Sequence, residues 1–96
     1  MKRQLPEFKF KNVERVEYKI IWKAPYKKYS ADGLCDDPKS LKPKIWINPA
    51  LEEKRLLEVI TEEILHSFMF EKNEKTVRKF ASVLKRLLYK MGWRKS

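Results

Sequence analysis

The pattern of apolar and polar positions divides the chain into a strand-like first half and a helical second half. Apolar residues occupy every second position from Val16 to Trp22, and charged residues separate most of them, as is typical of a half-buried strand. Lys44–Ile47 is β-branched and aromatic and predicts another strand. Tyr26–Tyr29 predicts a further short strand. Turn-forming residues fill Ser30–Lys39, so we expect a loop there.

The second half of the chain predicts two amphipathic helices. Asn48 suits an N-cap and Pro49 a first helical position, so the first helix is expected from there to about Phe70. Asn73 suits the cap of the second helix, and Gly92 provides its end. The apolar residues of the second helix follow the three-and-four spacing of one helical face: Val77, Phe80, Ala81, Leu84, Leu87, Leu88 and Met91.

Together these elements predict an α+β fold. The helices are separated by only a few residues, so they should form an antiparallel hairpin. We expect this hairpin to cover one face of a small, three-stranded antiparallel sheet. Residues 1–12 contain Pro6 and four basic side chains and are expected to form an irregular basic arm before a single domain at 13–96.

Length and cysteine content favour a cytoplasmic protein. The 96 residues suffice for one core, and no apolar run approaches the roughly 18 residues needed to span a membrane. We therefore expect no membrane partner. The one cysteine, Cys35, has no second cysteine with which to form an internal disulfide, which suits a reducing compartment.

Charge is distributed unevenly along the chain, which has a formal net charge of +10. Residues 50–71 carry two basic and six acidic side chains, whereas residues 72–96 carry nine basic and one acidic. The second helix could therefore contact nucleic acid or an acidic protein, although a solvated basic face is the simpler interpretation. The candidate contact residues are Lys75, Lys79, Lys85, Arg86, Lys90 and Arg94.

The polar edge of the first helix carries the candidate chemistry. Glu62, Glu63 and the only histidine, His66, are three and four residues apart, so they lie along one edge of the helix. In the zincin motif His-Glu-x-x-His, both histidines ligate zinc and the glutamate activates the attacking water. Here the five positions begin with Glu62 in place of the first histidine, and a carboxylate can also ligate zinc. An ordinary surface pair of Glu62 and His66 is the alternative.

From Val13 to Arg94 the chain resembles the small zinc metallopeptidases that many phages encode. The resemblance depends on the order of several features: Gly33 to Asp36, the Lys44–Ile47 strand, the spacing from Leu57 to His66, and the end of the second helix at Gly92-Trp93-Arg94. It implies a minimal zincin-like fold, a peptide or protein substrate, a zinc cofactor and, if the source is a phage, the host cytoplasm. It also implies Glu63 as the general base, with His66, Glu62 and Glu74 as zinc ligands.

The chain departs from the family pattern at the metal site. Glu62 replaces the first histidine, and Arg78 and Val83 stand where family members tend to be acidic. The third ligand is thereby reduced to Glu74 or Glu71. Two interpretations stay open: a zinc-dependent peptidase with a diverged site, and a non-catalytic binding module that uses the basic second helix.

Overall fold

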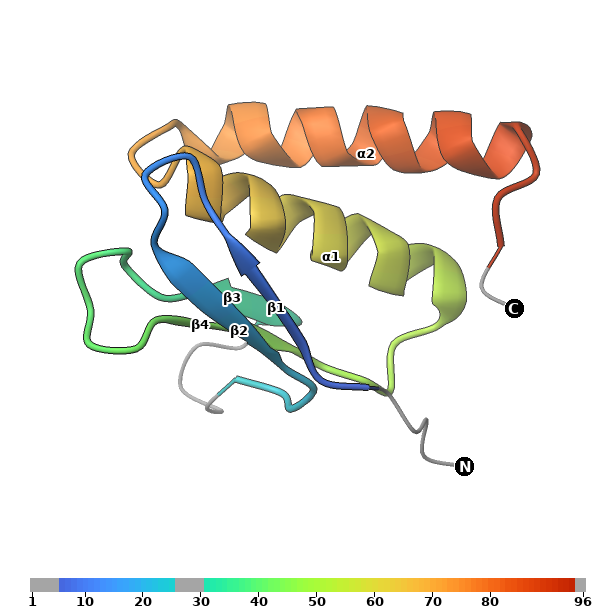
Figure 1. Ribbon diagram of the computed structural model, residues 1–96. Helices are drawn as coiled ribbons and strands as arrows, with labels where there is room; N and C mark the ends of the chain where they lie inside the picture. Colours follow the sequence, from blue (N-terminus) through green and yellow to red (C-terminus); the bar gives the residue numbers. More distant parts are fainter. Residues whose placement is uncertain (1–5, 26–30, 95–96) are drawn as a thin grey trace.

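The computed structural model describes residues 6–25 and 31–94, and it confirms the α+β class. The strands are β1 (Phe8–Lys11), β2 (Glu17–Ile21), β3 (Gly33–Cys35) and β4 (Lys44–Ile47), and the helices are α1 (Glu53–Phe68) and α2 (Glu74–Lys90). Helix α1 lies over one face of the sheet, and α2 packs on α1 in the opposite direction as an outer layer (Figure 1).

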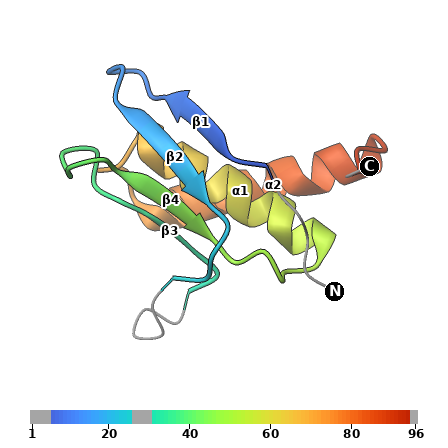
Figure 2. The same cartoon turned by 60° about the horizontal axis from the view of Figure 1, so that its bottom comes forward.

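The sheet has four strands and mixed directions, so the expectation of three antiparallel strands was wrong. Its spatial order is β1-β2-β4-β3, with β2 parallel to β4 and the other neighbouring pairs antiparallel (Figure 2). The parallel pair arises because the chain passes from β2 to β3 at the far edge and returns as β4 to the middle. The strand expected at Tyr26–Tyr29 lies outside the described residues.

Strand β1 lies in the segment that was expected to be an irregular arm. Its sequence does alternate apolar and charged residues, but over only four positions. Phe10 stacks on Tyr18 of β2 at a centroid distance of 5.7 Å and on Phe68 of α1 at 6.2 Å. These aromatic contacts hold the strand in the sheet, and the one with Phe68 joins residues that are distant in sequence.

Strand β3 lies in the segment that was expected to be a loop. Its three residues pair antiparallel with β4, from Gly33 opposite Ile47 to Cys35 opposite Ile45. A Cβ atom on Gly33 would be 2.6 Å from Cγ1 of Val59 in α1, closer than real Cβ contacts. The glycine therefore serves close packing of α1 on β3, which no local pattern could indicate.

The two helices differ in how well their starts were predicted. Asn73 caps α2 by accepting a hydrogen bond from the Lys75 backbone N–H, as expected. The cap of α1 is Glu52, whose side chain accepts from the Arg55 N–H, and not Asn48. Asn48 instead accepts from the Ala50 N–H in the preceding turn, because a side chain of this kind also stabilises turns.

A small core joins the sheet to α1. Its fully buried members include Tyr18, Ile45, Ile47 and Val59. The buried Asn12 side chain donates a 3.0 Å hydrogen bond to the backbone carbonyl of Ser67, so the β1–β2 turn is tied to the end of α1. Neither helix in the described part of the chain is long and apolar enough to cross a bilayer.

Candidate metal centre

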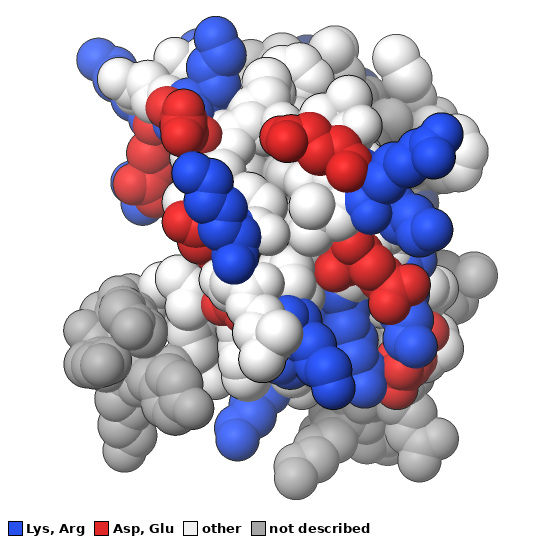
Figure 3. Space-filling model, turned by 60° about the vertical axis from the view of Figure 1, so that its left-hand side comes forward, with Lys and Arg blue, Asp and Glu red and all other residues white. Residues whose placement is uncertain are grey.

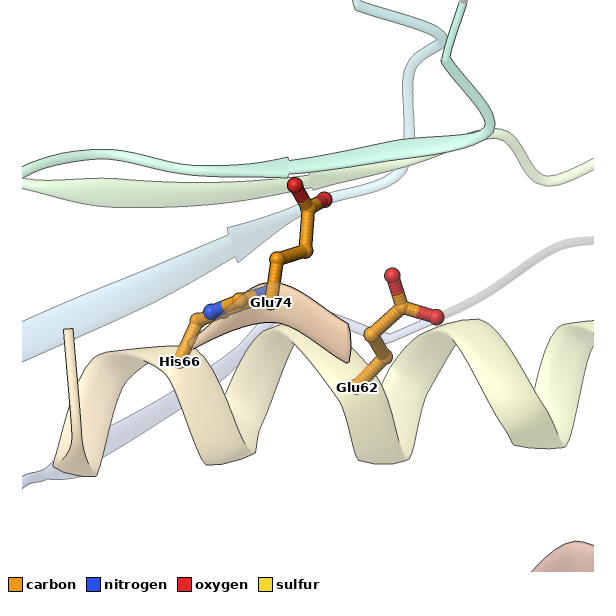
Figure 4. Close-up of side chains that lie close together, drawn as sticks. All are labelled: Glu62, His66 and Glu74. Carbon is orange, nitrogen blue, oxygen red and sulfur yellow. The ribbon is translucent and has the colours of Figure 1, made fainter. Parts of the chain in front are cut away.

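Three possible metal ligands come together where α1 lies beside the start of α2. Donor atoms of Glu62, His66 and Glu74 all lie within 4.8 Å of one another. Figure 4 shows the carboxylates of Glu62 and Glu74 pointing to the same side of α1, with the His66 ring beside Glu74. Ligands about 2.1 Å from one zinc ion are at most roughly 4 Å apart, so donors as far apart as 4.8 Å would have to move closer together to hold one ion.

Local structure accounts for this convergence. Glu62 and His66 are one turn apart on α1 and therefore share an edge. Glu74 is the first residue of α2, directly after the Asn73 cap, so the helix start fixes its place. Of the two third ligands that the sequence left open, Glu74 thus joins the group, whereas exposed Glu71 lines a separate cleft beside the α1–α2 connection.

Arg78 already contacts two of the three possible ligands. Its Nη2 atom is 2.9 Å from Oε1 of Glu74, and its Nε atom is 3.5 Å from Oε1 of Glu62. The guanidinium supplies positive charge where a metal ion would supply it. A metal ion must therefore compete with Arg78 for both carboxylates, while His66 stands outside these ion pairs.

Glu63 is the most strongly perturbed carboxyl group of the site. It is only 5% exposed and faces β3, where its side chain limits the space at Gly33. Burial, with the nearby carboxylates of Glu62 and Glu74, raises the pKa of Glu63 to about 8. A carboxyl group with such a pKa can hold a proton at neutral pH and exchange it without a large energetic cost.

Glu62 and Glu74, but not His66, line a polar cleft of about 550 Å³ between α1, α2 and the start of β3. Besides the site residues it is lined by Asp32, Arg55 and Glu58, which sequence reasoning did not select. Arg55 pairs with Asp32 at 3.1 Å and with Glu58 at 2.6 Å. Because Glu58 is four residues before Glu62, spacing alone could have placed it on this edge of α1. The position of Asp32 in the cleft depends on the tertiary fold, which spacing within one segment does not indicate.

Cys35 does not join the candidate ligands. It is buried at the end of β3, and its thiol donates to the Asp36 backbone carbonyl over 3.4 Å. Burial raises the pKa of the Cys35 thiol to about 12, despite the neighbouring Tyr18 hydroxyl. The thiol is therefore protonated at neutral pH and poorly suited to bind metal or react.

The basic residues proposed as an alternative contact surface are placed differently from one another. Lys85 faces α1 and pairs with Glu58 at 3.4 Å, and Arg94 lies 4.0 Å above the Tyr89 ring. The exposed members are Lys75, Lys79, Arg86, Lys90 and also Arg94. On the face drawn in Figure 3, acidic side chains lie directly beside basic ones, so positive charge does not form one uninterrupted patch there.

This arrangement of one imidazole, two carboxylates and an adjacent buried glutamate defines a candidate site for a divalent metal ion. No protein-family model matches the chain, and comparisons with curated proteins and with solved structures find no match.

Proposed function

We propose that this chain is a metallopeptidase-like protein that binds a divalent metal ion, with zinc as the expected ion, through Glu62, His66 and Glu74. The single observation that carries the proposal is the convergence of these donors from two helices within 4.8 Å. A nitrogen donor with two carboxylates is a ligand set that zinc accepts, and three protein ligands leave a coordination position open. A bound ion would supply Lewis acidity to an oxygen atom.

Glu63 is the proposed general base. It would take a proton from the water that attacks an amide carbonyl carbon, and return it to the nitrogen as the carbon–nitrogen bond breaks. Its raised pKa supports this role, because a base is most effective when its pKa is near the working pH. A cation held by Glu62 and Glu74 would favour the ionised form of Glu63.

The position of β3 supports a peptide as the substrate. This strand is at one edge of the described sheet, and its first residue, Gly33, lines the cleft together with Glu62 and Glu63. An extended peptide can bind to a sheet edge as an additional strand through main-chain hydrogen bonds. A peptide bound in this way would lie close to Glu63, the proposed base.

Zinc binding and hydrolysis can be tested separately. We expect the metal-depleted protein to take up about one zinc ion in competition with a chromogenic chelator, and His66→Ala to lose this uptake because the nitrogen ligand is removed. Exposed Glu71→Gln is the matched carboxylate control and should bind as the wild type does. If neither the wild type nor Arg78→Gln takes up zinc, the metal proposal is wrong.

The catalytic role requires a second measurement, on an unfolded protein substrate such as casein. Glu63→Gln should retain zinc and lose hydrolysis, whereas Glu71→Gln should retain both. If the wild type binds zinc but does not hydrolyse casein, the peptidase role is contradicted and only the metal-binding role remains.

A further inference from the structure

The apolar surface of α2 is wider than its contact with α1 requires. Val77 and Ala81 are buried against the rest of the molecule. Four other apolar residues are between 38% and 70% exposed and follow one another at spacings of three, four and four: Phe80, Val83, Leu87 and Met91. They form a second stripe along the helix, here called the outer stripe. Exposed apolar residues that adjoin one another on a surface can form an interaction site.

A row of basic side chains borders the outer stripe. Lys79 is one turn from Val83, and Lys90 is three residues from Leu87, so these cations are surface neighbours of the stripe. Together with Arg86, they are exposed and pair with no acidic side chain in the described part of the chain. On the side of α2 that faces α1, exposed Arg78 and partly buried Lys85 are both paired with glutamates of α1. The partner should therefore be both apolar and negatively charged.

We propose that α2 docks this molecule onto an anionic lipid surface, with the outer stripe in the interface and the basic row over the headgroups. An amphipathic helix with Lys or Arg beside an apolar stripe binds membranes in this way. A helix needs a long apolar run to span a bilayer, but it needs no such run to lie on the bilayer surface. The proposal is independent of the metal site.

The shape of α2 favours a bilayer over other occupants. The helix is the outermost layer of the fold (Figure 1). The outer stripe extends from Phe80 to Met91, which corresponds to about 16 Å along the helix axis. A fluid interface adapts to a convex helix surface, whereas a protein partner would need a matching groove. Beyond the helix end, Trp93 is 64% exposed, and indole rings are enriched at membrane interfaces.

Two alternatives match the surface less well. A nucleic acid would pair with the basic row but leave Val83, Leu87 and Met91 uncovered, because aliphatic side chains offer no ring for stacked bases. A second copy of the chain would bring two rows of unpaired cations together, and these would repel each other.

The test is co-sedimentation of the full chain with vesicles of phosphatidylcholine alone and of phosphatidylcholine with phosphatidylglycerol. We expect binding to the anionic vesicles only. Leu87→Gln should weaken it about tenfold, and the double variant Lys79→Gln/Lys90→Gln roughly thirtyfold. The matched controls are Leu41→Gln, at a leucine that is 92% exposed in another part of the molecule, and Lys11→Gln/Lys39→Gln. Both controls should bind anionic vesicles nearly as the wild type does.

Three results would overturn the proposal. The first is a failure of the wild type to bind anionic vesicles. The second is equal weakening by the two lysine double variants, or no effect of Leu87→Gln, since binding would then reflect net charge alone. The third is a stable dimer, or binding of a duplex oligonucleotide or an acidic protein through α2, without vesicle binding. Circular dichroism melting of each variant confirms that the compared proteins are folded.

Discussion

At the scale of single residues, Glu63 affects both the stability of the fold and the proposed chemistry. An unfolded glutamate has a pKa near its ordinary value, whereas the folded, metal-free protein raises the pKa of Glu63 to about 8. Between these two values the folded state retains a proton that the unfolded state loses. The contribution of Glu63 to stability is therefore greatest below the unfolded pKa and is lost as pH rises through the folded pKa.

We expect the free energy of unfolding contributed by this group to fall by up to about 1.4 kcal/mol per pH unit between roughly pH 5 and pH 8. Urea unfolding at several pH values, with EDTA present, measures this slope. Glu63→Gln should flatten it and be more stable than the wild type at the alkaline end, because no buried charge forms. The exposed Glu71→Gln variant should keep the wild-type slope. An unchanged slope in Glu63→Gln would show that other groups cause it.

Arg78 leads to a second prediction at this scale. Its ion pairs with Glu62 and Glu74 must break or rearrange when a metal ion takes those carboxylates. Arg78→Gln should therefore raise zinc affinity on the order of tenfold, because it removes a competing positive charge. Chelator competition measures the change.

Arg86→Gln is the control for that experiment, since Arg86 is on the same helix and makes no ion pair with the ligands. Equal zinc affinities for Arg78→Gln and the wild type would mean that the Arg78 side chain moves aside at little cost. The proposed metal site would then remain, but Arg78 would not compete with the metal ion for Glu62 and Glu74.

At the scale of elements, the close packing of α1 on β3 positions the site. Gly33→Ala would place a methyl group 2.6 Å from Val59 Cγ1 and 3.0 Å from the Glu63 side chain. We expect a loss of stability of about 1–3 kcal/mol, because α1 must move away from the sheet or strain its side chains. Urea unfolding measures this loss.

Gly92→Ala is a useful comparison for Gly33→Ala. Gly92 has a φ of 96°, but a Cβ atom there meets nothing within 4 Å, so any loss of stability comes from the backbone alone. Only Gly33→Ala should also lower the pKa of Glu63 by admitting solvent around it. An unaltered stability of Gly33→Ala would contradict the close packing of α1 on β3.

Sequence predicted the elements whose signals are local and missed those fixed by distant contacts. Strand β4, the cap of α2 and the shared edge of Glu62 and His66 follow from spacing within one segment. Strand β1 depends on Phe10 contacting Tyr18 and Phe68, and β3 depends on its fit against α1. The candidate ligands were selected from sequence, and the four-residue spacing of Glu74 and Arg78 could have indicated their ion pair. The pair of Arg78 with Glu62 depends on the packing of α2 on α1.

At the scale of the whole molecule, a strongly positive chain surrounds an acidic cleft. The formal net charge is +10, while the cleft is lined by Asp32, Glu58, Glu62, Glu63 and Glu74 against two arginines. Self-repulsion among the exposed cations should destabilise the compact state at low ionic strength. The ion pairs around α1 act in the opposite direction, so the response to salt reports which effect is larger.

We expect repulsion to be larger, because most exposed pairs contribute little to stability while the charge excess acts over the whole surface. Raising the ionic strength from about 0.01 M to about 0.15 M shortens the Debye length from roughly 30 Å to roughly 8 Å. The Tm should then rise by a few degrees, as measured by circular dichroism with EDTA present. Lys79→Gln/Lys90→Gln removes two exposed cations and should reduce this rise. A Tm that falls with salt would instead show that the ion pairs of Arg55, Arg78 and Lys85 dominate the electrostatic stability of the fold.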